Sequence, residues 1–517
     1  MGISPGIGNK DRSKSSSEAR GDYLSILSGT GQNVIGIVIA ALATFAANIL
    51  LSRALGPGGF GVVTVMTQAA FVLSFATRAG MDMAVLRDVA VEIGVGRSDR
   101  IRVGVSRATA IAALASLAAA AVMVAASGLV RSLFQISGDS YPYVVEAAAV
   151  GLPFLALANV WLSATRGLKI MRYTLYIFWA GQPIAWVLLI LAGWQVAQTP
   201  TISVLAYSLS WLVASIAAYY AWRKESRIWE PRPMEPGGLT RLLRYAGPRA
   251  PAALFSQLLF WTDLFVVTRY VSDTEVGVYS AALRAGQVLV LFLTSVSLMF
   301  SPYVADLHNR KETARLDRLF KAFTRWTLAA TIPVFLVLAI APGAVLDLFG
   351  PDYGGGETAL LILLAGQFVN VATGGVGFVL IMVGRTGWDL VVYAVSLAIN
   401  LGLAFVLAPR YGIEGAAVAN AVTFALSKWA RLALVARFVK IQPYDRNYFR
   451  LLAPTMIALV VTWAVHQALS GAWLVDLAAT ALAGMITYGA AYALLGLTSG
   501  ERQSLTAAVV KLRSRTS

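Results

Sequence analysis

Two ionisable residues lie within long apolar segments of this 517-residue chain. Asp263 is seven residues before the end of the apolar segment 246–270, and Arg284 is eight residues into the next one, 276–300. At 1.5 Å per helical residue, both lie roughly 10 to 12 Å from the turn that joins the segments. A charge at that depth is costly and faces a polar cavity or a partner. We therefore expect Asp263 and Arg284 to meet, either as a structural ion pair or as part of a polar site.

Further charged candidates lie near the ends of apolar segments. Arg78 and Arg87 cluster with Asp82 and Asp88 where the second segment ends, which suits either an anion site or an ordinary membrane anchor. Glu146 lies early in the fourth segment, where an acid also suits a solvated helix N-terminus. Arg284 is the one basic residue that we assign to the interior of a segment.

Two arginines and a set of amides complete the candidates. Arg53 and Arg269 occupy turns on the same predicted side of the membrane and could attract an arriving anion. Amides suit sugar hydroxyls, but helix–helix hydrogen bonds use the same residues, so we expect only some of them to line a cavity. The amides within segments are Asn48, Gln68, Asn159, Gln182, Gln257, Gln287, Gln367, Asn370, Asn400 and Asn420.

The composition argues against metal and thiol chemistry. The chain has no cysteine, so disulfides and thiolate metal sites are excluded, and its two histidines, His308 and His466, do not suggest a metal centre. Hydrophobic residues make up 58% of the chain and charged residues 13%, about half the charged share of a soluble domain. We expect an all-α membrane protein with no cofactor.

The chain contains fourteen apolar segments of the length that spans a bilayer, which is about 20 residues. We expect transmembrane helices near 31–52, 60–78, 106–127, 142–165, 173–194, 202–222, 246–270, 276–300, 326–348, 358–383, 388–408, 413–436, 450–470 and 473–496.

The basic residues predict the orientation. With alternating sides, 37 of the 42 Lys and Arg residues fall on the side of the N-terminus, and only Arg53, Arg131, Arg269 and Arg410 fall opposite. The positive-inside rule therefore predicts that both termini are cytoplasmic. The same rule accounts for the net charge of +16 without a nucleic-acid partner.

The second long inner loop has a pattern of its own. Residues 307–326 place apolar side chains at helical spacing with basic residues between them, which predicts an amphipathic helix at the inner interface or an extension of a neighbouring span. The outer loops are all too short to hold a folded domain.

An internal repeat relates two of the hairpins. Residues 50–69 (LLSRALGPGGFGVVTVMTQA) align without a gap to residues 266–285 (VVTRYVSDTEVGVYSAALRA). The alignment matches Arg53 to Arg269 and Gly61 to Gly277, and it places Gln68 opposite Arg284. An offset of six spans keeps both halves in one orientation, so we expect two six-helix lobes related by an axis along the membrane normal.

These observations divide the chain into six parts. We expect a mostly disordered cytoplasmic tail at 1–28, an N-lobe at 29–222, a cytoplasmic linker at 223–245, a C-lobe at 246–440, two extra helices at 441–497 and a cytoplasmic tail at 498–517.

The sequence resembles the Wzx-type polysaccharide-unit flippases of the multidrug/oligosaccharidyl-lipid/polysaccharide exporter superfamily. The resemblance is carried by WTDLFVVTRYVSDTEVGVYSAALR at 261–284, by LLSRALGPGGFGVVTV at 50–65 and by YGIEGAAVAN at 411–420. One position departs from the pattern, because Leu264 stands where relatives often carry a basic residue. The resemblance implies two lobes in a V shape, alternating access and an undecaprenyl-diphosphate-linked oligosaccharide as cargo.

The resemblance also suggests roles for the candidates. Arg284 would hold the diphosphate, and Asp263 would take and release a coupling cation, H⁺ or Na⁺, with Glu146 as a second candidate for the cation. Arg53 and Arg269 would attract the diphosphate outside. The remaining candidates for substrate binding are Arg78, Arg87, Gln68, Gln287, Asn159 and Asn370.

Three other classes remain open. A lipid II flippase and a multidrug/cation antiporter share the expected fold, although lipid II flippases usually carry more arginines within the first lobe. A membrane glycan polymerase or ligase would need a large outer loop or a carboxylate cluster, so we expect no enzyme. We expect a monomer in the bacterial inner membrane whose partners are the lipid-linked cargo, membrane lipids and other polysaccharide-assembly proteins.

Overall fold

The computed structural model describes residues 7–94, 101–136, 140–226, 238–469 and 472–498, and all regular elements in these ranges are helical. In chain order they are α1 (Ile7–Thr77), α2 (Met81–Gly94), α3 (Ile101–Ala125), α4 (Ser127–Leu133), α5 (Val144–Gly167), η2 (Thr174–Gly181), α6 (Gln182–Gly193), α7 (Pro200–Glu225), α8 (Gly238–Val267), α9 (Asp273–Asn309), α10 (Thr313–Ile340), α11 (Pro342–Leu346), η3 (Pro351–Gly356), α12 (Glu357–Ala372), α13 (Val376–Met382), α14 (Thr386–Phe438), η4 (Arg446–Leu451), α15 (Leu452–Ala468), α16 (Trp473–Ala491) and η5 (Tyr492–Gly496).

The predicted number of spans is confirmed. Twelve helical stretches of the described chain are long and apolar enough to cross a membrane. Two of them, in α1 and α14, are each divided by a glycine with positive φ, Gly56 at +66° and Gly412 at +55°. Glycine has no Cβ to clash there, so each kink joins two spanning arms. Counting the arms separately gives fourteen crossings, and the all-α membrane fold is as expected.

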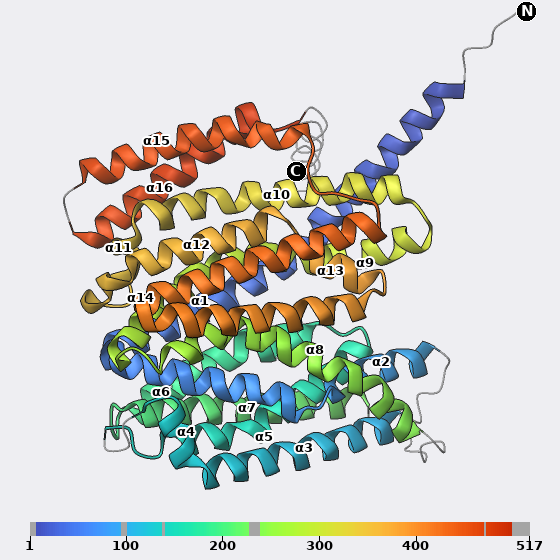
Figure 1. The fold of residues 1–517 in the computed structure, drawn as a ribbon. Coiled ribbons are helices and arrows are strands. Elements are labelled where there is room, and N and C mark those ends of the chain that lie inside the picture. The colour runs from blue at the N-terminus through green and yellow to red at the C-terminus, as the bar shows by residue number, and fades with distance from the viewer. Residues whose placement is uncertain (1–6, 95–100, 137–139, 227–237, 470–471, 499–517) are drawn as a thin grey trace, which may run out of the picture.

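The helices gather into two lobes and an outer pair (Figure 1). Helices α2–α7 form one lobe with the second arm of α1, and α8–α14 form the other. The pair α15 and α16 packs on α10, at the edge of the second lobe. The strongest link between the lobes is the contact of α1 with α9.

The repeat predicted from the sequence appears as a direct contact. A Cβ on Gly61 would lie 2.8 Å from the backbone nitrogen of Gly277, and a Cβ on Gly277 would overlap the carbonyl oxygen of Pro57. The two residues matched by the repeat therefore pack against each other where α1 meets α9. Only glycine allows the two backbones to approach so closely.

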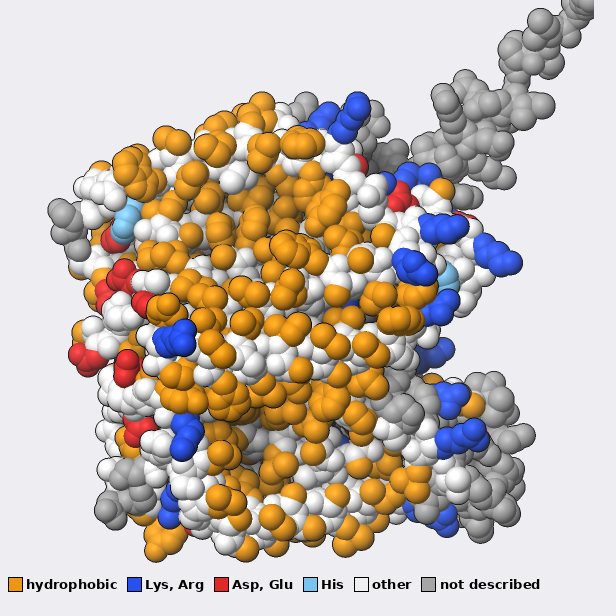
Figure 2. Space-filling view, in the orientation of Figure 1, with side chains coloured by type: hydrophobic (Ala, Val, Ile, Leu, Met, Phe, Trp, Pro, Cys, Tyr) orange, Lys and Arg blue, Asp and Glu red, His pale blue; other side chains and the backbone are white. Residues whose placement is uncertain are grey.

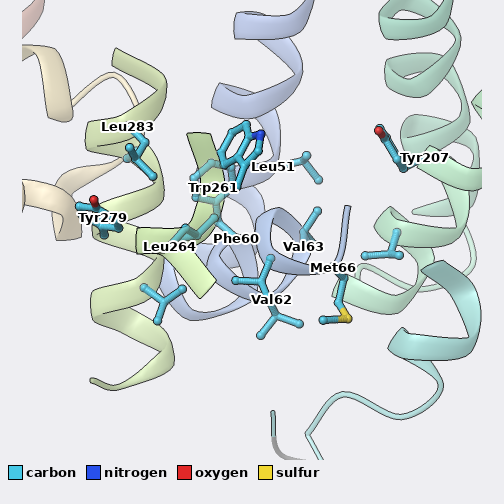
Figure 3. Packing of buried hydrophobic residues seen from close by; sticks show 14 of the residues in the cluster. Leu51, Phe60, Val62, Val63, Met66, Tyr207, Trp261, Leu264, Tyr279 and Leu283 are labelled. Atoms are coloured by element: carbon cyan, nitrogen blue, oxygen red, sulfur yellow. The ribbon is translucent and has the colours of Figure 1, made fainter. Parts of the chain in front are cut away.

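The core between the lobes is apolar and continuous (Figure 3). Leu51 and Phe60 of α1 lie with Trp261 and Leu264 of α8 and with Tyr279 of α9, all of them buried. Leu264 is fully buried in this core, which explains the apolar residue at the position where a basic one was noted as missing.

Charge separates the two ends of the molecule (Figure 2). Lys and Arg gather at the end that holds the turn between α9 and α10, which we call the basic end. Asp and Glu gather at the end that holds α11 and η3, which we call the acidic end. A broad band of hydrophobic side chains covers the surface between them, as a bilayer requires.

Two predicted boundaries differ from the structure. The structure gives residues 7–28 of the predicted tail as helical, because α1 begins at Ile7; no proline interrupts the chain between Pro5 and Pro57. The predicted linker runs to residue 245, but α8 already begins at Gly238. Ala246 of α8 packs in an apolar cluster with residues of α2.

The amphipathic segment is an extension of a span. Residues 313–326 form the first part of α10, which continues without a break to Ile340. Its apolar side chains are buried against the C-lobe rather than free to lie on a membrane: Leu316, Leu319, Phe320 and Phe323.

Candidate functional site

Asp263 and Arg284 do not form the predicted ion pair. Asp263 is fully buried, and its carboxylate accepts hydrogen bonds from the Tyr279 hydroxyl and from the Asn420 side-chain nitrogen, the latter at 3.0 Å. The two residues lie at different distances from the turn between their helices, because α8 ends at Val267 and α9 begins only at Asp273. Asp263 is therefore about 6 Å from its helix end and Arg284 about 16 Å from its own.

Arg284 instead stacks on an aromatic ring. Its guanidinium lies 5.0 Å from the centre of the Trp261 ring. Its Nε atom is buried and has no hydrogen-bond partner within the described protein, and no described carboxylate pairs with it. Tyr207 on α7 of the other lobe is close enough to act on its charge. An uncompensated cation thus lies where the two lobes meet.

A small pocket with three amide side chains in a largely apolar lining lies among helices α8, α9, α12 and α14. It is lined by Phe260 of α8, by Leu283, Gly286 and Gln287 of α9, by Leu363 and Gln367 of α12 and by Asn420 and Phe424 of α14. The predicted candidate Gln287 therefore faces this pocket, and its side-chain nitrogen has no partner within the described protein.

Two more polar side chains belong near Asp263. Val266 packs against Ala404 and Ala419, one on each arm of α14. Asn400 lies one helical turn beyond Ala404, and Thr423 one turn beyond Ala419, in each case away from the kink at Gly412. Each shares a helix face with that alanine and lies toward the level of Asp263. Both are 0% exposed, and their side-chain polar atoms have no partner within the described protein. Among the described residues, no group of three acidic, histidine or cysteine side chains could hold a metal ion.

The two matched outer arginines differ in their contacts. Arg53 donates to the backbone oxygens of Leu348 at 2.8 Å and of Asp347 at 2.6 Å, and it lies 5.2 Å from the Trp473 ring. It therefore links the α1 kink to the C-lobe and to α16. Arg269 is exposed in the turn between α8 and α9.

The predicted cluster at the basic end of α1 forms in part. Arg78 is buried, pairs with Asp82 at 3.1 Å and lies over the Phe75 ring at 3.8 Å. Arg166 of α5 is an additional cation that acts on the same carboxylate. Arg87 is exposed on α2.

Three other candidates have local partners. Glu146 pairs with Arg131 at 2.9 Å, which fits an acid in the first turn of a helix. Asn159 donates to the backbone oxygen of Leu155 in its own helix. Gln68 is buried in α1, and its side chain is 8% exposed.

One buried cation was not predicted. Arg431 of α14 is 3% exposed and pairs with Asp389 at 2.8 Å, so Arg284 is not the only basic residue inside a span. The sequence signal was Asp389 near the start of the neighbouring arm. Asn370, a predicted candidate, donates to the side-chain oxygen of Gln367 at 2.9 Å.

Comparisons with known proteins agree on the family. The model of the polysaccharide biosynthesis protein family matches residues 26–308, and the MatE model matches residues 248–406. The "Putative O-antigen transporter" of Shigella flexneri is 23% identical over 415 residues, covering 76% of this chain and 94% of that protein. The "Probable low-salt glycan biosynthesis flippase Agl15" of Haloferax volcanii is 22% identical over 202 residues, 39% of this chain.

The coverage of the relatives differs. The matches to Agl15 and to the "Probable flippase AglR" of the same organism span 43% and 51% of those proteins. Among solved structures, the lipid II flippase MurJ in an inward closed conformation has a TM-score of 0.69 at 15% identity over 90% of this chain and 98% of its own. An inward-facing multidrug transporter of the MATE family has a TM-score of 0.61 at 14% identity, over 79% and 99% of the two chains.

The structural matches show the fold, and the family model covers more than half of the 517 residues. The chain therefore belongs to the polysaccharide biosynthesis protein family, within the multidrug/oligosaccharidyl-lipid/polysaccharide exporter superfamily.

Proposed function

We propose that the protein is a flippase that moves an undecaprenyl-diphosphate-linked oligosaccharide from the inner to the outer leaflet by alternating access, for surface polysaccharide biosynthesis. Moving such a lipid makes and breaks no covalent bond. It requires a counter-charge for the diphosphate, polar groups for the sugars and two lobes that open alternately.

The observation that carries this proposal is that Arg284 pairs with no carboxylate among the described residues. A guanidinium inside a span normally has a carboxylate or backbone partner. Arg284 has an aromatic face and a free donor at the junction of the lobes instead. The planar guanidinium matches phosphate oxygens with two parallel hydrogen bonds. The diphosphate of the cargo would supply the missing negative charge.

Asp263 supplies the coupling in this proposal. Its carboxylate is buried between three helices and accepts hydrogen bonds from Tyr279 of α9 and Asn420 of α14. Oxygen atoms of this kind suit either a proton or Na⁺. Binding of the cation there would change the charge of a group that touches three helices, so it can bias how the lobes pack.

The closed acidic end defines one of the two required states. Gly61 on the second arm of α1 packs against Gly277 of α9, so the two lobes are joined at the acidic end. We take this end to face the outside of the cell, because basic residues favour the cytoplasmic side. This state would receive cargo from the cytoplasmic leaflet.

Two functions of the same superfamily are the alternatives. A multidrug/cation antiporter would use the same fold with a more apolar cavity. A lipid II flippase would use the same diphosphate chemistry, and the resemblance to MurJ is structural only. The family model and the unpaired Arg284 favour a lipid-linked polysaccharide unit.

Deletion of the gene tests the proposal. The lipid-linked oligosaccharide should accumulate in the cytoplasmic leaflet, and one surface polysaccharide should be lost. If the intermediate reaches the outer leaflet at the normal rate in a strain without a paralogue, the proposal is wrong. Accumulated lipid II, with the surface polysaccharide intact, would identify the alternative flippase.

A further inference from the structure

Two rows of buried polar side chains lie on neighbouring helices inside the C-lobe. The row on α12 consists of Gln367, Asn370 and Thr373, and the row on the second arm of α14 consists of Asn420, Thr423 and Ser427. Spacings of three and four residues place each row on one helix face. None of these side chains is more than 6% exposed.

The two helices touch along these rows. A Cβ on Gly366 of α12 would lie 2.6 Å from the Cα atom of Ala421 in α14. Gln367 and Asn420, the first members of the rows, line the same small pocket. The rows therefore border one shared space where they begin.

Several polar atoms along the rows lack partners within the described protein. Within the rows they are Oδ1 of Asn370 and Oγ1 of Thr423; both polar side-chain atoms of Asn400, on the first arm of α14, and Nη2 of Arg431, beyond the end of the second row, also lack partners. More than about 90% of buried polar groups in proteins bind another group or an ordered water. A concentration of unpartnered atoms in one column thus indicates polar contents such as water or a cation.

The column joins two charged sites. At one end, Asn420 donates to Asp263. At the other, Arg431 pairs with Asp389 and donates to the Ser427 hydroxyl. Eleven residues of helix separate Asn420 from Arg431, which is roughly 16 Å. Arg431 lies toward the basic end, because the arm begins at the acidic end beside Gly412.

The span that carries the first row is broken where that row ends. Gly374, at φ +68°, separates α12 from α13, and Gly377 of α13 lies beside the Arg431 side chain. Interruptions of spanning helices are tolerated where the backbone lines a polar path, and transporters use them at ion sites.

We propose that the two rows enclose a hydrated path along which the coupling cation moves between Asp263 and the basic end of the molecule. This inference rests on the proposed coupling role of Asp263. Asp389 stands at the basic end of the path and offers the cation a carboxylate when it separates from Arg431. The path lies within one lobe, so cation movement is separate from the route of the lipid between the lobes.

Single cysteines test the path, because the natural chain contains none. Thr423→Cys and Ser427→Cys replace small side chains and preserve most of the packing. The probe is Ag⁺, which is a small cation and binds thiolates, applied in chloride-free medium to inside-out vesicles whose outer surface is the cytoplasmic face. After quenching and denaturation, a fluorescent maleimide reports the thiols that Ag⁺ has not blocked.

Matched controls lie beside the rows. Ala419→Cys on α14 and Val371→Cys on α12 are also fully buried but lie in apolar clusters. We expect Ag⁺ to block both row cysteines at least tenfold faster than the two controls. Equal rates for row and control cysteines would overturn the path. This assay needs no cargo, so its failure would leave the proposed flippase activity standing.

Coupling is tested separately in proteoliposomes. Thr373→Val keeps the shape of the side chain and removes its hydroxyl from the row on α12. We expect the acceleration of flipping by a cation gradient to fall several-fold while flipping without a gradient is retained. An unchanged response to the gradient would overturn the assignment of the path to the coupling cation.

Discussion

At the residue scale, the account depends on a cation that has no carboxylate. Arg284 stacks on Trp261 and keeps a donor unused, whereas Arg78 and Arg431 each pair with an aspartate. Paired arginines stabilise helix contacts, and an unpaired one is available to a ligand. The proposed diphosphate site follows from this difference rather than from the presence of an arginine as such.

Replacing Arg284 by lysine should therefore impair transport. Lysine keeps the charge but loses the planar pair of donors, and a charge-assisted hydrogen bond contributes about 1.5–3 kcal/mol. We expect flipping in proteoliposomes to slow by about tenfold or more, with unchanged thermal unfolding. The control is Arg437→Lys at an exposed position in the last turn of α14, which should flip normally. Full activity of Arg284→Lys would remove Arg284 from the substrate site.

Asp263→Asn should separate flipping from its driving cation. The asparagine oxygen can still accept from Tyr279, and the amide of Asn420 can turn to accept from the new nitrogen, so the protein should fold. We expect flipping that no longer responds to a proton or Na⁺ gradient. Asp352→Asn, at an exposed position in η3, is the control. A gradient response that survives in Asp263→Asn would show that the cation binds elsewhere.

The sequence identified charged residues that the structure buries within spans, but not their partners. Asp263 and Arg284 stood out because charges are rare in apolar segments. Their pairing was predicted from an assumed short turn, and the longer turn between Val267 and Asp273 shifts their depths. Tyr279 and Trp261 carry no charge, so no rule of composition identifies them as neighbours.

At the element scale, the repeat has a physical basis in two glycines. Gly61 and Gly277 let α1 and α9 approach closely at the acidic end, which joins the two lobes. The sequence predicted the repeat, the fourteen spans and the basic end correctly, because apolar length and loop charge determine them. It did not predict the break at Gly374, although Gly375 and Gly377 stand beside it, since glycines are also frequent in continuous membrane spans where helices pack closely.

Gly277→Ala should destabilise this crossing. The added methyl group would overlap the carbonyl of Pro57, and overpacking in a core costs about 1–3 kcal/mol. We expect a lower unfolding temperature in detergent. The matched variant Gly354→Ala places its methyl group where nothing lies within 4 Å, and it should unfold like the natural protein. Equal stability of the two variants would contradict the close contact.

At the scale of the whole molecule, the two charged ends predict one topology. Reporter fusions after Arg241 and Arg315 should be cytoplasmic, and fusions at Asp273 and Asp352 should be periplasmic. Twelve candidate spans of the described chain, two of them divided at glycine kinks, give fourteen crossings, so all four positions must agree. A single fusion on the wrong side would reverse the assignment of the closed acidic end to the outside.

The central claim is that the lobes must separate at the acidic end to deliver the cargo. A Cβ on Gly58 would lie 3.8 Å from the Cβ of Asp273, which is the usual spacing of a disulfide. In this cysteine-free chain, Gly58→Cys with Asp273→Cys would therefore link the lobes only under oxidation. The measurement is flipping of undecaprenyl-diphosphate-linked oligosaccharide in proteoliposomes by this double variant. We predict flipping when the disulfide is reduced and at least a tenfold loss when it is formed, recovered on reduction; equal flipping in both states, or none by the natural protein, would contradict the account.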